Sequence, residues 1–315
     1  MPVEQSEVNR NLTERLFEEA QAIELEDAIK AGMVGFMGRA LVQATLPYRE
    51  PDRNLPVWGR EAGNTSLIIK PGYYSKTEKG KNGKTETVLT SMGYPYGTIP
   101  RLLLAWIGTE AVRTKEKHLI LGSSLSDFMT QLGLTAQTGG KNGSITRVRE
   151  MMKRLFAADM AIVRGDGTGD RDFANSKFSI AEEAALWWDP QAPDQAGLWK
   201  STVTLTDRFF NEIVRNPVPI DLRALKGLRN SPMAIDLYCW LTYRNFSVSK
   251  PTTVSWEALK LQFGSGATAE KKFRETLNAA LKKVVVVYPQ ANVKSTRAGL
   301  ELSPSLTSVP KLVRD

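Results

Sequence analysis

The sequence predicts an α+β protein with two tandem winged-helix domains preceded by a helical N-terminal segment, and three observations support this. Between residues 123 and 158 a capped helix, a polar connection and a basic amphipathic helix follow one another, and a hairpin pattern comes next. The same order recurs between residues 231 and 302. The chain has 315 residues, 42% of them hydrophobic, which is enough to bury two ordinary cores.

The domain boundaries and the charge follow from this division. We expect a helical segment and linker over residues 1–60, the first winged-helix domain over 61–200 and the second over 201–315. The net charge is +8 and the sequence pI is near 9.4, which favours a polyanionic partner such as nucleic acid. Residues 1–60 hold 7 basic and 10 acidic side chains, so the rest of the chain carries +11. The N-terminal segment is therefore a poor candidate for the DNA contact.

The N-terminal segment is helical in character from about Leu12 to Gln43, where Glu, Ala and Leu are frequent. Its second half is weakened by three glycines, Gly32, Gly35 and Gly38. They fit either close helix packing or a flexible leader, and the sequence leaves both open. Residues 47–56 then read as a turn-rich linker.

The first domain opens with two expected strands, residues 66–70 and 87–90, joined by a loop with four lysines, Lys76, Lys79, Lys81 and Lys84. A soluble loop and a contact to the DNA backbone are both open interpretations. A strongly apolar helix is expected from Ile99 to about Arg113, followed by a short strand at residues 119–121.

A helix pair organises this domain. Ser124 can cap the first helix and Gly133 is placed to end it. The second helix runs from Ser144 to about Ala158. Its predicted buried stripe consists of Ile145, Val148, Met152, Leu155 and Phe156, and its other face carries Thr146, Arg147, Glu150, Lys153 and Arg154. Residues 161–163 then lead into a glycine-rich hairpin tip at residues 165–169, with the return strand near Phe178.

The second domain repeats this order. Ser231 and Pro232 begin a helix that runs to about Arg244, a short strand is expected at 252–254, and a helix at 255–263 ends at Gly264. An amphipathic helix over residues 268–283 has Phe273, Leu277, Ala280, Leu281 and Val284 inside, and residues 284–288 and 293–302 are expected to form a second hairpin. The second helix of such a pair normally lies in the DNA major groove, so both basic helices are candidate DNA readers.

Catalytic and metal chemistry are disfavoured. His118 is the single histidine and Cys239 the single cysteine, so neither an internal disulfide, an all-Cys/His zinc site nor the histidine cluster of a rolling-circle initiator can form. Gly83, Lys84 and Thr85 lack the glycine that a phosphate-binding loop needs five positions before Gly83. With no secretory leader and no long apolar run, we expect a cytoplasmic protein without membrane contact, cofactor or enzymatic activity.

Three blocks carry a family resemblance. Residues 95–115 read PYGTIPRLLLAWIGTEAVRTK, residues 121–134 read LGSSLSDFMTQLGL, and residues 217–244 read PVPIDLRALKGLRNSPMAIDLYCWLTYR. These blocks combine Gly, Pro, Trp and Arg at fixed offsets, and over residues 60–305 the chain resembles the plasmid-encoded RepA family of replication initiators. More distantly it is similar to the iteron-binding initiators of theta-replicating plasmids.

The resemblance implies that the chain binds repeated double-stranded sequences, or iterons, at a plasmid origin and opens an adjacent AT-rich region. It also implies contact with host replication proteins such as the helicase and the origin-binding initiator, and a homodimer that represses its own gene. Residues 1–60 lie outside the resemblance.

The candidate DNA contacts come from the two helices and their flanks. In the first domain they are Lys141, Ser144, Thr146, Arg147, Glu150, Lys153 and Arg154, and in the second Thr268, Lys271, Lys272, Glu275, Asn278, Lys282, Lys294 and Arg297. A winged-helix transcriptional repressor without a replication role needs the same groove contacts, so the residues alone leave this alternative open.

Overall fold

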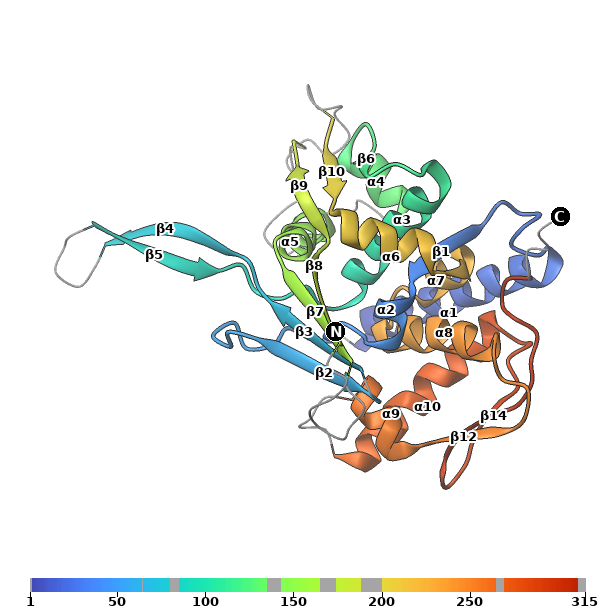
Figure 1. The fold of residues 1–315 in the computed structure, drawn as a ribbon. Coiled ribbons are helices and arrows are strands. Elements are labelled where there is room, and N and C mark those ends of the chain that lie inside the picture. Colours follow the sequence, from blue (N-terminus) through green and yellow to red (C-terminus); the bar gives the residue numbers. More distant parts are fainter. Residues whose placement is uncertain are drawn as a thin grey trace.

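The computed structural model describes residues 2–63, 65–79, 85–134, 143–164, 174–187, 200–264 and 269–310. It is a mixed α+β structure (Figure 1). The helices are α1 (Pro2–Leu25), α2 (Arg39–Gln43), α3 (Thr98–Thr114), α4 (Leu125–Gln131), α5 (Ser144–Phe156), α6 (Asp207–Arg215), α7 (Leu222–Leu228), α8 (Pro232–Asn245), α9 (Trp256–Phe263) and α10 (Glu270–Val287). The strands are β1 (Val34–Gly38), β2 (Trp58–Ala62), β3 (Thr65–Lys70), β4 (Tyr73–Lys79), β5 (Thr85–Ser91), β6 (His118–Ile120), β7 (Asp159–Arg164), β8 (Ala174–Ser179), β9 (Ala181–Ala185), β10 (Thr202–Leu205), β11 (Pro217–Asp221), β12 (Thr252–Ser255), β13 (Val293–Ser295) and β14 (Gly299–Leu302).

The strands form small antiparallel sheets instead of one large one. Their orders are β2-β3-β7-β8, β6-β10-β9, β12-β14-β13, β1-β11 and β4-β5. The buried apolar side chains nevertheless form one connected cluster that includes Leu103 of α3 and Leu237 of α8. The helices therefore hold the sheets together, with α3 and α8 at the centre of the molecule.

The helix pair predicted between residues 123 and 158 is confirmed. Ser124 Oγ accepts a hydrogen bond from the backbone N–H of Asp127 at 3.1 Å, so it caps α4, and Gly133 follows the helix with φ of +69°. The expected hairpin is also present, because β7 pairs with β8 in register from Asp159↔Ser179 to Arg164↔Ala174. The predicted stripe of α5 is buried throughout.

The elements between residues 231 and 302 follow the predicted order with one correction. Ser231 caps α8, as expected, and Ser255, which was predicted only as the start of a helix, caps α9. The prediction of a strand at residues 284–288 is wrong, because α10 continues to Val287 and the hairpin is formed by β13 and β14. Val284 and Val287 are buried where α10 packs on α8 and α1, and this tertiary burial outweighs the strand preference of β-branched residues.

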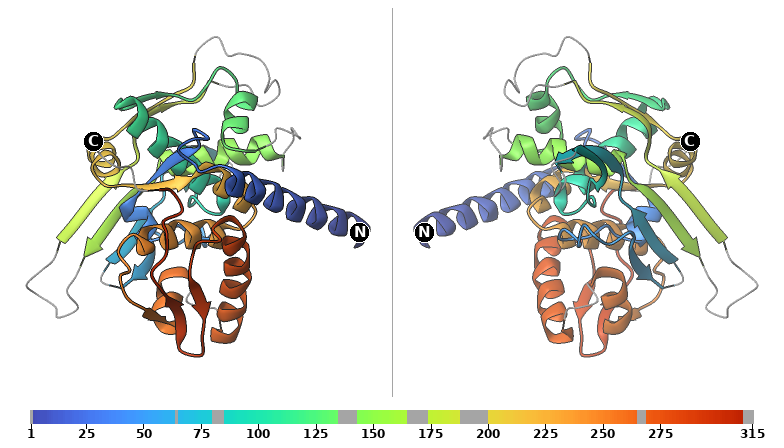
Figure 2. Two further views of the ribbon diagram at one scale, coloured as in Figure 1. Left: turned by 90° about the vertical axis from the view of Figure 1, so that its right-hand side faces the viewer. Right: turned by 90° about the vertical axis from the view of Figure 1, so that its left-hand side faces the viewer.

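The N-terminal segment differs from the expected long helix. α1 ends at Leu25, and β1 pairs with β11, residues that are nearly two hundred positions apart in the chain. A Cβ at Gly35 would overlap the side chains of Leu222 and Thr109. The absence of a side chain at Gly35 therefore lets β1 lie close to α3 and α7, while pairing with β11 makes this segment a strand. The N-terminal part of α1 projects from the body (Figure 2), while its C-terminal part packs on α7 and α10.

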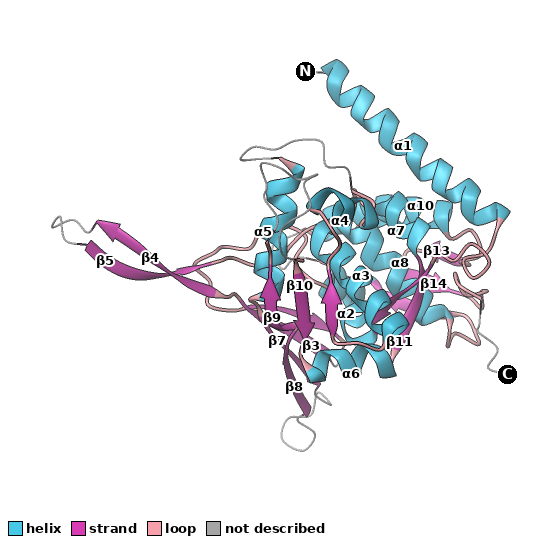
Figure 3. Ribbon diagram, turned by 90° about the horizontal axis from the view of Figure 1, so that it is seen from above, coloured by secondary structure: helices cyan, strands magenta, loops and turns pink. Residues whose placement is uncertain are grey.

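The lysine-bearing segment is also different from the expected loop. The strand at residues 65–70 belongs to the sheet of β2 and β7, and β4 and β5 form a separate two-stranded ribbon. This ribbon projects from the body on the side away from α8 and β11 (Figures 1 and 3). Lys76 and Lys79 lie on β4, whereas Lys81 and Lys84 lie outside the described residues.

A buried ion pair joins the two halves of the molecule. Arg101 of α3 donates from Nε to Asp236 Oδ1 at 2.8 Å and from Nη2 to Asp236 Oδ2 at 2.7 Å, and Asp236 belongs to α8. Three backbone carbonyls, those of Leu46, Pro47 and Gly97, accept the remaining guanidinium hydrogen bonds. All five N–H donors of Arg101 are thus used, which fixes α3 against α8. The division at residues 60 and 200 stays a prediction.

Candidate nucleic-acid interface

The exposed face of α5 is narrower than the sequence predicted. Arg147 and Lys153 are exposed, while Ser144, Thr146 and Glu150 are half-buried. The buried stripe packs α5 against α3, so its position depends on the apolar spacing that the sequence shows. Lys141 lies outside the described residues. On this helix Arg147 and Lys153 present their charge to solvent.

Arg154 is buried, so its expected place on the exposed face is wrong. Its side chain is 3% exposed. Nη1 donates to Glu50 Oε1 at 2.7 Å and Nε donates to Glu150 Oε1 at 3.0 Å, and the guanidinium lies 5.5 Å from the ring centroid of Tyr96. The physical reason is that the segment after α2 folds back over α5 and supplies a carboxylate. Arg154 holds this segment and is not available to DNA.

The electrostatics of Glu50 reflect this role. Burial by itself would raise the pKa of Glu50, but hydrogen bonds from Arg53 and Arg154 outweigh it and hold the pKa below its ordinary value. Arg53 donates from Nε to Glu50 Oε1 at 2.5 Å. The carboxylate therefore bridges a buried and an exposed arginine at the end of α5.

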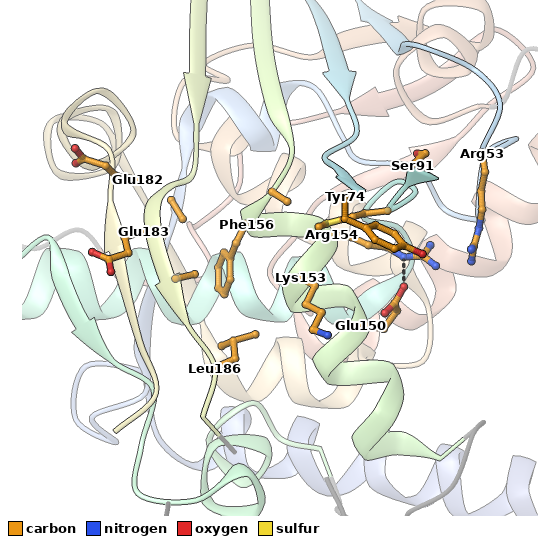
Figure 4. Close-up of a pocket in the computed structure, with 14 residues that line it drawn as sticks. Arg53, Tyr74, Ser91, Glu150, Lys153, Arg154, Phe156, Glu182, Glu183 and Leu186 are labelled. Carbon is orange, nitrogen blue, oxygen red and sulfur yellow. Dashed lines mark hydrogen bonds and ion pairs between the residues drawn. The ribbon is translucent and has the colours of Figure 1, made fainter. Parts of the chain in front are cut away.

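A cavity of about 610 Å³ lies beside α5 (Figure 4). Glu150 and Lys153 extend from the helix, with Arg53 and Tyr74 on one side and two glutamates of β9, Glu182 and Glu183, on the other. A smaller hollow of about 250 Å³ is lined by Arg53, Thr146 and Arg147 among others. Carboxylates line the larger cavity beside the basic side chains, and they repel an anion that would enter it. Its basic side chains are therefore better suited to contacts at the rim of the cavity. Sequence reasoning did not find Arg53 or Tyr74, because only the tertiary fold brings them to α5.

The exposed face of α10 carries more unburied charge. Lys271, Lys272, Glu275 and Lys282 are exposed, and Lys272 Nζ lies 3.6 Å from Glu275 Oε2. Asn278 is half-buried, and its buried Oδ1 has no hydrogen-bond partner among the described residues. Thr268 lies outside the described residues. The lysines of α10 thus line one side of the helix over more than three turns.

Arg274 connects α10 to α9. It forms an ion pair with Glu270 and lies 5.1 Å from the ring centroid of Trp256. Lys294 and Arg297, predicted as contacts from the hairpin, are exposed at β13 and in the turn that follows it. The predicted cations of α10 and of its hairpin are therefore all exposed to solvent.

The remaining chemical groups are accounted for by the fold. Within the described ranges, no cluster of three or more His, Cys, Asp or Glu side chains is arranged to hold a metal ion. Cys239 is buried in α8, and burial raises the pKa of its thiol. His118 Nδ1 lies 3.0 Å from Thr204 Oγ1 at the β6–β10 pair. Over all the residues that the structure describes, no helix is long and apolar enough to cross a membrane.

Comparison with known proteins defines the family. The profile of plasmid-encoded RepA proteins matches residues 94–258, just over half of the chain. This chain therefore belongs to the plasmid-encoded RepA family of replication initiators. The matched region includes α3, α5 and α8, and it ends before α10.

Two crystal structures of domains 2 and 3 of RctB are similar in fold. One has a TM-score of 0.45 and 11% sequence identity, and the similarity covers 78% of this chain and 82% of that chain. The other has a TM-score of 0.48 and 11% identity, with 82% of this chain and 94% of that chain covered. No curated protein is significantly similar to this chain.

Proposed function

We propose that this protein binds repeated double-stranded sequences at a plasmid origin through two tandem winged-helix modules. The observation that carries the proposal is the repeated order of elements: α3, β6, α4, α5 and the β7–β8 pair, then α8, β12, α9, α10 and the β13–β14 pair. In each unit the last helix before the hairpin is basic and amphipathic, which is the arrangement of a groove-reading helix.

The predicted contacts are divided between positioning and reading. Lys153 on α5 and Lys271, Lys272 and Lys282 on α10 would contact phosphates, because lysine acts as a point charge. Arg147 would meet a base edge, since Arg pairs with guanine in the major groove. Asn278 is left out, because its Oδ1 is buried and cannot accept the hydrogen bond that pairing with adenine needs. Lys294 and Arg297 of the second hairpin would contact the backbone beside α10. Arg154 is left out because it is buried.

The wider role follows from the family. We infer that origin binding leads to opening of an adjacent AT-rich segment and to contact with the host helicase and origin-binding initiator, in the bacterial cytoplasm where plasmids replicate. The chain would act by binding and not by catalysis, with domains at residues 61–200 and 201–315. A homodimer that represses its own gene would reuse the same modules on a palindrome.

Footprinting on the flanking DNA of the gene tests the proposal. Two helices in major grooves one turn apart should protect a single site of about 20 base pairs per monomer, repeated in a direct array. Lys271→Ala/Lys272→Ala should weaken protection and plasmid maintenance. The control, Lys30→Ala/Lys117→Ala, removes the same charge from exposed ion pairs outside α5 and α10. Protection of one groove only, or of a lone palindrome without plasmid maintenance, would contradict the proposal.

A further inference from the structure

The β4–β5 ribbon has exposed side chains along most of its length. In the described residues, β4 and β5 pair only with each other, in register from Tyr73↔Ser91 to Lys79↔Thr85. Leu89 is 71% exposed and Tyr73 is 51% exposed. A two-stranded ribbon with both faces exposed to solvent is only marginally stable by itself. A binding partner that covers one face would therefore stabilise it.

The two faces of the ribbon differ in chemistry. Directly opposite residues share a face of a sheet, and alternate residues along a strand lie on opposite faces. One face, which we call the hydroxyl face, includes Tyr73, Ser75, Thr77, Thr85, Thr87, Leu89 and Ser91, and Lys79, opposite Thr85, occupies its last position on β4. The other, which we call the carboxylate face, consists of Tyr74, Lys76, Glu78, Glu86, Val88 and Thr90.

The carboxylate face is unsuited to a polyanion. Glu78 lies directly opposite Glu86, and like charges at this spacing repel each other. Lys76 Nζ lies 2.7 Å from Glu78 Oε1, so its positive charge is partly offset by the neighbouring carboxylate. The hydroxyl face carries six hydroxyl groups and no carboxylate. Hydroxyl groups donate hydrogen bonds to phosphate oxygens and to base edges, and an apolar side chain such as Leu89 can contact a thymine methyl group.

We propose that the hydroxyl face of the β4–β5 ribbon lies on DNA that flanks the segment contacted by α5. This inference rests on the proposed function. A two-stranded ribbon fits the major groove, and seven residues per strand reach about 20 Å from the body. Tyr74 and Ser91, at the base of the ribbon, line the same cavity as Glu150 and Lys153 of α5 (Figure 4). The ribbon therefore starts beside the proposed α5 contact.

A second copy of the chain fits the ribbon less well. One face of a ribbon two strands wide and about 20 Å long offers roughly 200 Å². A stable dimer buries about 800 Å² on each partner. The large apolar groups on the hydroxyl face are Tyr73 and Leu89, whereas the centre of a dimer interface is mostly apolar.

Paired charge substitutions on one strand separate the two faces. Thr87→Glu/Leu89→Glu adds two negative charges to the hydroxyl face, and Val88→Glu/Thr90→Glu adds the same charge at the same spacing to the carboxylate face. On a fragment that includes the flanking DNA, we expect the first variant to lose about tenfold or more in affinity together with flanking protection. The second variant should lose markedly less.

Substituting lysine at the same two positions tests whether a loss of affinity is caused by misfolding of the ribbon. Thr87→Lys/Leu89→Lys should bind the long fragment more tightly than the wild type, whereas a misfolded ribbon would bind more weakly with either charge. Equal effects on the two faces, or a hydroxyl-face variant that changes the sedimentation of the free protein without changing DNA affinity, would overturn the inference in favour of an inert ribbon or a self-association surface.

The inference and the proposed function can fail separately. If the wild type does not bind the repeats, the proposed function fails. If the wild type binds the repeats and the footprint depends on Lys271 and Lys272, the proposed function stands. If the two glutamate variants of the ribbon then have equal effects, only the ribbon inference fails.

Discussion

The helices α5 and α10 carry similar sequence patterns but present different charge to solvent. Arg149 and Glu150 correspond in the repeat to Arg274 and Glu275, so Arg154 corresponds to Ala279. Arg154 is buried between two carboxylates, whereas Ala279 is exposed. A buried arginine that binds a neighbouring segment thus occupies the place where the other helix has a small side chain open to solvent.

The difference comes from what covers each helix. The segment that carries Glu50 lies over the end of α5, and Glu50 accepts hydrogen bonds from both Arg154 and Arg53. The lysines of α10 are exposed along its length. Helical spacing therefore decides which residues point inward, but a distant segment decides which outward-facing charges remain available for DNA.

The largest expected effect concerns the buried Arg101–Asp236 pair, which joins α3, on which α5 packs, to α8, on which α10 packs. Arg101→Met leaves Asp236 buried without its partner, and we expect a loss of about 3–5 kcal/mol in the free energy of unfolding. Urea denaturation measures it. The double variant Arg101→Met/Asp236→Leu should recover much of the loss, and Arg113→Met, in an exposed pair with Glu110, should cost less than about 1 kcal/mol. Similar losses for Arg101→Met and Arg113→Met would show that the buried pair contributes no more to stability than an exposed one.

Matched core deletions test whether the helices are equally well packed. Phe156 and Leu281 correspond in the repeat and are 7% and 8% exposed. Phe156→Ala should destabilise the protein by about 3–5 kcal/mol and Leu281→Ala by about 2–5 kcal/mol, because each leaves a cavity. Thermal unfolding of both variants is the measurement. A negligible loss for one of them would mean that its helix is not anchored by this stripe.

The third prediction concerns Arg154 directly. Arg154→Met removes hydrogen bonds to Glu50 and Glu150, and because both glutamates keep access to water we expect a loss of about 1–3 kcal/mol. Lys153→Met, at the neighbouring exposed position, should change stability by less than about 0.5 kcal/mol. Equal melting temperatures for the two variants would contradict the structural role of Arg154.

The salt dependence of DNA binding compares the two helices as DNA contacts. Each phosphate contact removed should reduce the slope of log K against log salt by about 0.9. Lys271→Ala/Lys272→Ala should therefore reduce it by about 2, Lys153→Ala by about 1, and Lys76→Ala, whose charge is paired with Glu78, by less. If only the α10 variant changes the slope, α5 is not a DNA contact and becomes a candidate surface for a protein partner.

The smallest effect is on the pH dependence of stability. The pKa of Glu50 in the folded protein lies below its ordinary value of 4.5, so the unfolded chain takes up this proton more readily. The stabilisation is present above pH 4.5 and is lost as the pH falls through the lower folded-state pKa. Glu50→Gln should therefore flatten the acid limb of a stability profile, and Arg53→Met should flatten it in part. An unchanged acid limb in Glu50→Gln would contradict the assigned role of this carboxylate.

Local sequence determined most of the two helix units. The caps at Ser124 and Ser231, the buried stripe of α5 and the β7–β8 hairpin depend on residues close together in the chain, and the sequence predicted each of them. The candidate lysines on α10 were placed on its exposed face for the same reason. Hydrophobic periodicity and capping are short-range properties, so they can be read without the fold.

Tertiary structure alone decided how distant segments use these units. Residues 284–287 are helical because α10 packs on α8 and α1. The segment around Gly35 is a strand because β11, far away in the chain, pairs with it. The lysine-bearing segment forms a separate ribbon because β3 pairs with β2 and β7 and not with β4 or β5. Arg101 and Asp236 are 135 positions apart and Glu50 and Arg154 are 104 apart, and neither pair has a local signal. Contacts of this kind depend on which side chains the complete fold brings together. Only the tertiary structure therefore decides whether a charged side chain is exposed or buried in an ion pair.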